Sequence, residues 1–156
     1  MKKIDFGQSL AILANIGVIA GILFLALELR QSNRIAIAST ELAIRDSYGA
    51  FNEILLTDPG VRELLLKIRD PNPSLTPDDE IQVRAYLRRL LNTWIAIEVA
   101  YDNELLSADT YALVEQEPQG ILSAYPGAKP SMRMVVDEAP GQDSRRVIRS
   151  IEALLE

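Results

Sequence analysis

An apolar run near the beginning of the chain limits the folds available to it more than any other feature. Residues 10–27 read LAILANIGVIAGILFLAL, and Asn15 is the single polar side chain among them. A helix of about 20 residues rises about 30 Å, which is the thickness of a bilayer's hydrocarbon core. The run is apolar on all sides, whereas a helix on the surface of a soluble protein carries one apolar stripe. We therefore expect a membrane-spanning helix.

Two alternatives account less well for this run. A cleaved signal peptide has an apolar region of roughly 7–15 residues and a small-x-small cleavage site, but this run is longer and Glu28-Leu29-Arg30 offers no such site. A central helix of a soluble bundle would have to be covered on every side, and a chain of 156 residues has few such positions. Sidedness stays open, because basic residues flank the run almost equally: Lys2 and Lys3 before it, and Arg30, Arg34 and Arg45 after it.

Small residues within the run indicate a possible contact between two helices in lipid. Gly17 and Gly21 form a GxxxG pattern, and Ala14 lies one turn earlier. Small side chains at this spacing let helix backbones approach closely where packing replaces the hydrophobic effect. Asn15 adds a potential interhelical hydrogen bond. The alternative is chance, because glycine is common in membrane helices.

The helix is expected to continue beyond the apolar run. Between Arg30 and Thr57 there is no proline, and the only glycine is Gly49. Apolar residues recur there at spacings of 7, 4, 3 and 4, which is one face of a helix: Ile37, Ile44, Tyr48, Phe51 and Leu55. Ile35 and Leu42 lie on another side.

Start signals predict the helices that follow. Asp58-Pro59 is typical of an N-cap followed by proline in the first turn, and Thr76-Pro77 is a second example with three acids behind it. Between them, residues 70–74 are expected to form a loop. The second helix is predicted to extend from Pro77 to about Leu106 and to organise the core. Its apolar stripe consists of Val83, Leu87, Leu90, Trp94, Ile97, Tyr101 and Leu105.

Shorter elements are expected in the remainder. The sequence predicts a helix over 108–117, turns over 118–130 with a short helical turn at 121–124, and a helix over 132–138. Asp143 is expected to cap a last helix. No alternating apolar and polar run is long enough to predict a strand. The chain is therefore predicted to be all-α, with a tail and transmembrane helix over residues 1–30 and a small helical bundle domain over 31–156.

Composition excludes several classes of function. The formal charge is −6, and cysteine and histidine are absent. Nucleic-acid binding needs a concentrated basic surface, and no thiolate or imidazole is available as a nucleophile, base or zinc ligand. A metal site would have to consist of oxygen ligands alone. There is no Gly-rich phosphate loop, GxSxG elbow or HExxH motif, so we expect no cofactor.

Two carboxylates stand out on the long central helix. Glu98 lies about 60° from the centre of the stripe at Trp94, and Asp102 follows one turn later. Paired carboxylates hydrolyse glycosides, but two acids one turn apart are common. The ordinary interpretation is a boundary glutamate satisfied by an arginine or a backbone group. Together with Tyr101 these residues mark a candidate pocket: Trp94, Glu98, Tyr101 and Asp102.

Several short motifs carry a resemblance. The apolar run ends in Glu28-Leu29-Arg30-Gln31 with Asn33 close behind, and Leu75-Thr76-Pro77 and a mid-helix Trp94 follow. In this layout the chain resembles a loose group of small bacterial single-pass membrane proteins. The resemblance implies the architecture and a place in the bacterial inner membrane. It implies no activity.

We therefore expect a membrane-anchored, non-enzymatic interaction or assembly module. Its partners would be the bilayer and either a second copy or another membrane protein, with contact through Ala14, Asn15, Gly17 and Gly21. The alternative is a membrane-tethered domain that binds or senses a small ligand near Trp94. An enzyme that uses Glu98 and Asp102 is a distant third.

Overall fold

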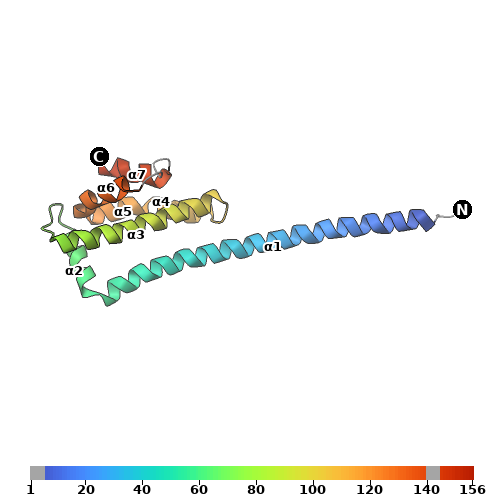
Figure 1. Cartoon of the computed structure of the whole chain (residues 1–156), viewed down its shortest axis with the longest axis horizontal. Helices are drawn as coiled ribbons and strands as arrows, with labels where there is room; N and C mark the ends of the chain where they lie inside the picture. Colours follow the sequence, from blue (N-terminus) through green and yellow to red (C-terminus); the bar gives the residue numbers. More distant parts are fainter. Residues whose placement is uncertain (1–5, 140–144) are drawn as a thin grey trace. The chain divides into compact units, whose positions relative to one another are not determined.

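The protein is all-helical, as predicted. A computed structural model describes residues 6–139 and 145–156, and no strand occurs in these ranges (Figure 1). In chain order the elements are α1 (Phe6–Thr57), α2 (Pro59–Lys67), α3 (Pro77–Asp102), α4 (Ala108–Glu115), α5 (Glu117–Ala124), the 3-10 turn η1 (Pro126–Ala128), α6 (Lys129–Asp137) and α7 (Arg146–Leu155).

The apolar run lies within a single long helix, α1, of 52 residues. Internal contacts divide the chain into residues 1–39 and residues 40–156, the second of which contains the bundle. Every residue of the apolar run, residues 10–27, is exposed; Leu10 is 62% exposed and Phe24 is 66% exposed. Among the described residues, α1 is the one helix long and apolar enough to cross a membrane.

Both predicted helix starts are confirmed. The Asp58 carboxylate accepts the backbone N–H of Gly60 at 2.8 Å, and Pro59 occupies the first turn of α2. Thr76 begins α3 with a reciprocal capping box, in which its hydroxyl accepts the N–H of Asp79 and the Asp79 carboxylate accepts the N–H of Thr76. These caps satisfy donors that a helix N-terminus leaves free.

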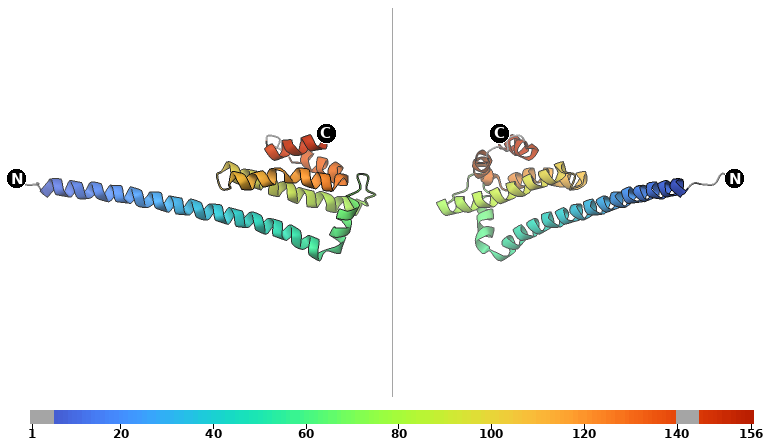
Figure 2. Two further views of the ribbon diagram at one scale, coloured as in Figure 1. Left: turned by 180° about the vertical axis from the view of Figure 1, so that it is seen from behind. Right: turned by 45° about the vertical axis from the view of Figure 1, so that its right-hand side comes forward.

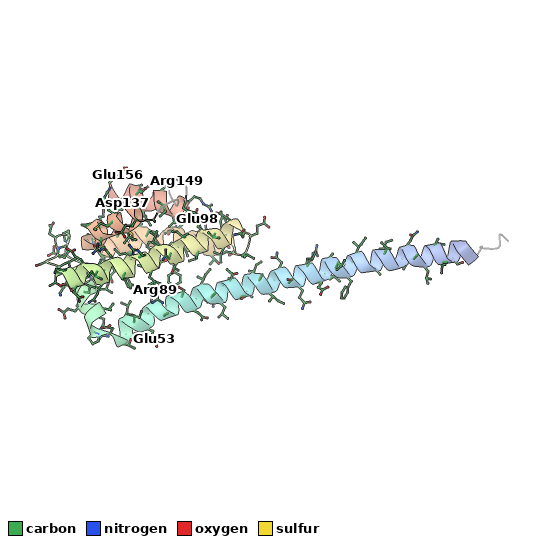
Figure 3. All side chains as sticks on the ribbon, viewed as in Figure 1. Glu53, Arg89, Glu98, Asp137, Arg149 and Glu156 are labelled. Atoms are coloured by element: carbon green, nitrogen blue, oxygen red, sulfur yellow. The ribbon has the colours of Figure 1, made fainter. Side chains whose placement is uncertain are left out.

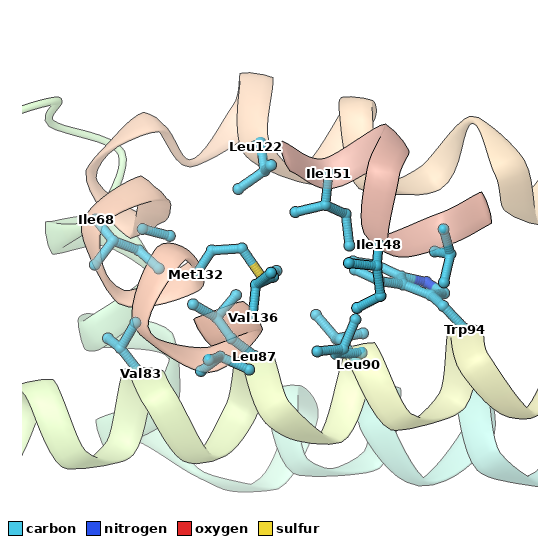
Figure 4. Close-up of a cluster of buried hydrophobic side chains, with 14 of the residues drawn as sticks. Ile68, Val83, Leu87, Leu90, Trp94, Leu122, Met132, Val136, Ile148 and Ile151 are labelled. Atoms are coloured by element: carbon cyan, nitrogen blue, oxygen red, sulfur yellow. The ribbon is translucent and has the colours of Figure 1, made fainter. Parts of the chain in front are cut away.

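The predicted stripe of α3 forms the centre of the core. Figure 4 shows Val83, Leu87, Leu90 and Trp94 in one row, facing side chains of α5, α6 and α7. Each of these four residues is at most 3% exposed. The facing residues include Leu122, Met132, Val136, Ile148 and Ile151.

The end of α3 was predicted four residues too late. The helix stops at Asp102, because Glu104 adopts a left-handed conformation with φ of 59°. The N–H of Leu105 then bonds the carbonyl of Ala100 at 2.9 Å, and that of Glu104 bonds the carbonyl of Tyr101 at 3.0 Å. This is a Schellman motif, which normally uses glycine. Its glutamate gave no sequence signal for a stop.

Residues 117–124 differ from the prediction of turns. They form α5, with Pro118 in the first turn. A backbone N–H in the first turn has no partner within the helix, so proline, which lacks this group, is tolerated there. By the same rule α6 begins at Lys129 with Pro130 in its first turn, three residues earlier than predicted. α4 ends at Glu115, two residues early. The predicted cap at Asp143 lies outside the described residues, whereas the helix expected behind it is present as α7.

Side chains from the last part of α1 complete the bundle. Phe51 is buried against Tyr86 of α3, with ring centroids 5.6 Å apart in an edge-to-face arrangement, and the Arg89 guanidinium lies over the Phe51 ring at 4.7 Å. Elsewhere in the bundle, α6 and α4 pack along α3, and α5 and α6 pack against α7 (Figure 2).

Candidate functional site

Glu98 is buried and binds the beginning of α7. Its side chain is 3% exposed, and it points from α3 into the bundle (Figure 3). One carboxylate oxygen accepts the backbone N–H of Arg146 at 2.9 Å, and the other accepts the N–H of Val147, also at 2.9 Å. Arg145 precedes α7 and makes no side-chain cap bond. Glu98 therefore takes the place of the N-cap residue from another helix.

Arg146 lies over two stacked tyrosine rings beside this cap. The rings of Tyr101 and Tyr111 are 4.4 Å apart and nearly parallel, and the guanidinium lies 5.3 Å and 4.9 Å from their centroids. It also pairs with Asp102 and lies 3.7 Å from Glu98. Burial raises the pKa of the Tyr111 hydroxyl. Asp102 is thus paired with the same guanidinium that lies near Glu98, and Arg145 is a second cation, 3.5 Å from Asp102.

The other end of α7 is held by cations. Lys129 Nζ donates to the carbonyl of Leu154 at 2.8 Å, and the Arg133 guanidinium donates to the carbonyl of Leu155. Positive side chains at a helix C-terminus complement the negative end of its dipole, just as Glu98 complements the positive end. α7 is thus fixed at both ends by side chains of other helices.

A second carboxylate, that of Glu117 at the start of α5, joins three helices. The same oxygen accepts the indole N–H of Trp94 at 2.9 Å and the hydroxyl of Tyr48. Burial, followed by the hydrogen bond to Glu117, raises the pKa of the Tyr48 hydroxyl. Sequence reasoning missed this residue, because nothing local distinguishes Glu117 from a solvated acid.

The space beside Trp94 is small. A cavity of about 10 Å³ is lined by Trp94, Tyr111, Val114, Glu115, Val147 and Ser150. This is about the volume that one water molecule requires, whereas small-molecule pockets occupy several hundred Å³. The four residues of the candidate pocket do lie near one another on α3. Trp94 and Glu98 are buried in the core, where both form hydrogen bonds with other helices.

The junction of α2 and α3 contains an ion pair that also belongs to the capping box. Lys67 Nζ lies 3.3 Å from Asp79, which caps α3 through the N–H of Thr76. The backbone hydrogen bond from Thr76 lowers the pKa of the Asp79 carboxyl, and the side-chain hydrogen bond to Asp79 raises the pKa of Lys67.

This geometry predicts an acid-dependent contribution to stability. Because the folded state lowers the pKa of Asp79, the contribution is present above the ordinary value of 3.8 and is lost as the pH falls through the lowered value. We expect Asp79→Asn to lower the midpoint of urea unfolding at pH 6. As the pH falls below 3.8, the difference between the variant and the original chain should shrink. A difference that stayed constant from pH 6 to pH 3 would contradict this assignment.

Two features are absent from the described residues. No group of three acidic side chains there is placed to hold a metal ion, and no buried side-chain nitrogen or oxygen there lacks a hydrogen-bond partner. Ala14, Asn15, Gly17 and Gly21 lie on α1 in its exposed apolar part.

Comparison with known proteins adds no assignment. No family model, no curated protein and no solved structure matches this chain.

Proposed function

We propose that the protein is a membrane-anchored helical interaction module, held in the bilayer by residues 10–27 and acting through protein contacts rather than catalysis. One observation carries the proposal. The most apolar 18-residue window of α1 is exposed along its whole length, whereas the core helix of a soluble protein would be mostly buried. Exposed apolar patches larger than a few hundred Å² are rare on soluble monomers, because apolar surface in water is unfavourable. A lipid environment removes this unfavourable contact with water.

The arrangement of the bundle supports a non-enzymatic role. Glu98, Asp102 and Glu117 are each engaged by a backbone group, a cation, an indole or a phenol. A catalytic pair needs a water-accessible cleft between its carboxylates. Glu98 is instead 3% exposed and accepts two backbone hydrogen bonds.

Self-association within the apolar run is the contact we favour. A methyl group added at Gly17 or Gly21 would meet open space, so no neighbour within the described chain requires glycine at either position. In lipid, the backbone of a second helix could approach closely at these two glycines, because they carry no side chain. Seven residues after Gly21, the same face carries Glu28, whose charge would face its copy in a parallel pair. We therefore confine the proposed contact to residues 14–21.

Membrane extraction tests the anchor. After expression in bacteria, the full chain is expected to stay with the membrane pellet in alkaline carbonate and to be released by detergent. The intact mass should include the apolar run. Recovery in the soluble fraction would overturn the anchor, and a mass lacking the first residues would indicate a cleaved signal sequence instead.

Disulfide crosslinking tests the self-contact. The chain has no cysteine, so Ala14→Cys introduces a single thiol on the glycine face. Oxidation in native membranes is expected to give a dimer. Gly17→Ile with Gly21→Ile should reduce its yield roughly tenfold, the effect of about 1.4 kcal/mol. Ala26→Ile, a matched enlargement nine residues after Gly17 on the opposite face, should leave it unchanged. All changes are made in the Ala14→Cys chain. Equal dimer yields with no further change, with both glycines replaced and with Ala26→Ile would exclude this contact.

A further inference from the structure

A groove on the bundle is lined by apolar and basic side chains. It lies where the end of α1 meets α2 and Tyr125, and its volume is about 270 Å³. The lining consists of Leu55, Arg62, Leu65, Leu66, Arg69 and Tyr125. Leu66 is 64% exposed, which leaves a large apolar side chain in water.

The walls of this groove are fixed by hydrogen bonds. Arg62 donates to the carbonyls of Leu55 and Leu56 at 3.1 Å and 2.7 Å, and so joins α2 to the end of α1. Gly127, two residues after the lining residue Tyr125, donates its backbone N–H to the carbonyl of Ile68 at 2.9 Å. This bond joins the segment that contains Tyr125 to the end of α2. A groove formed in advance loses little conformational entropy when it is filled.

The charge of the groove is opposite to that of the chain. Two of the six lining residues are arginines and none is acidic, although the chain carries a net charge of −6. Three acids lie close to these arginines in sequence: Asp58 caps α2, Glu63 lies 3.6 Å from Lys67, and Asp70 accepts the backbone N–H of Asn72. The groove therefore favours an occupant with acidic groups around an apolar centre.

The shape of the groove favours one kind of occupant. Small-molecule sites are concave and bury most of the ligand surface, whereas this groove leaves the lining residue Leu66 64% exposed. Side chains projecting from a helix need less space, and helix-in-groove binding uses residues at positions i, i+3, i+4 and i+7, which share one face of the helix. Arg62 belongs to α2, and Arg69 lies two residues beyond the end of that helix at Lys67; both line the groove. Two acids on one face of a bound helix, one on each side of its apolar anchors, would supply charges that pair with these arginines.

We propose that this groove binds an acidic amphipathic helix of a partner protein, with leucine-like anchors over Leu65 and Leu66 and carboxylates facing Arg62 and Arg69. The inference rests on the interaction-module function proposed above, because it assigns that module a partner surface. It does not depend on the contact between copies within the apolar run.

A designed peptide tests the groove on the full chain in lipid nanodiscs. The probe is a fluorescein-labelled, helix-stabilised 15-residue peptide with glutamates at positions 4 and 11 and leucines at positions 7 and 8. Its control has lysines in place of the glutamates. Fluorescence anisotropy is expected to show binding of the acidic peptide at least tenfold tighter than that of the lysine peptide.

Variants locate the binding. Arg69→Glu and Leu66→Glu each change an exposed residue of the groove, so they should keep the helical circular dichroism and weaken binding at least tenfold. Ile81→Glu changes a residue of α3 that is 58% exposed and does not line the groove, and should bind as the original chain does.

Three outcomes would overturn the groove proposal: no binding of the acidic peptide, equal binding of both peptides, or unchanged binding by Arg69→Glu and Leu66→Glu. Crosslinking of Ala14→Cys in the same nanodiscs separates the two proposals. A crosslinked dimer with no peptide binding would remove the groove alone, whereas loss from the membrane fraction would remove the anchor.

Discussion

Replacing Glu98 by alanine is expected to destabilise the bundle by about 4 kcal/mol. The substitution leaves the N–H groups of Arg146 and Val147 without their acceptor in the interior, where an unsatisfied donor costs about 1–3 kcal/mol. It also leaves a void beside Trp94 and removes a negative charge from the positive end of α7. Because domains are stable by about 5–15 kcal/mol in total, this is a large fraction.

Urea unfolding in detergent, followed by tryptophan fluorescence, measures the effect. Trp94 is the single tryptophan of the chain and is 1% exposed, so its emission reports the core directly. Glu98→Gln is the matched control: it preserves volume and one acceptor, and should cost about 1–2 kcal/mol. A change below 1 kcal/mol for alanine would show that Glu98 does not hold α7.

Gly127→Ala is expected to destabilise the bundle by about 3 kcal/mol, because the added methyl group has no room. A Cβ at this position would lie 2.2 Å from the carbonyl oxygen of Asp70 and 2.9 Å from that of Ile68. Backbone atoms cannot yield as a flexible side chain can. The contact between η1 and the segment after α2 would have to open, and the hydrogen bond from Gly127 to Ile68 would be lost.

Gly120→Ala is the control for this prediction. Gly120 lies in α5, and a Cβ there would meet nothing within 4 Å. Alanine should stabilise that helix by about 0.5–1 kcal/mol. The same unfolding measurement compares the two variants, and equal effects would contradict the close approach at Gly127.

Periodicity and capping chemistry predicted much of the fold. The stripe of α3 could be read directly, because Val83, Leu87 and Trp94 recur at helical spacing and the core lies on that face. Thr76 and Asp58 announced helix starts through local side-chain chemistry. Helix caps and apolar stripes depend on residues a few positions apart, so they can be recognised from the sequence without knowledge of the tertiary structure.

The contacts between distant segments were not predictable in the same way. Glu98 was expected to meet an arginine or a backbone group, but the choice of the first N–H groups of α7, 48 and 49 residues away, depends on tertiary packing. Glu117 joins Tyr48 and Trp94 across 69 and 23 residues. Gly127 was visible only as a turn residue, because its close neighbours come from another part of the chain.

The two ends of α7 are anchored in different electrical surroundings. Glu98 acts at the first turn from a buried position, where dissolved ions screen a charge only weakly. Lys129 and Arg133 act at the last turn from exposed positions, where ions compete for them. Rising ionic strength is therefore expected to weaken the hydrogen bonds from Lys129 and Arg133 more than those to Glu98, so that α7 frays first at its last turn.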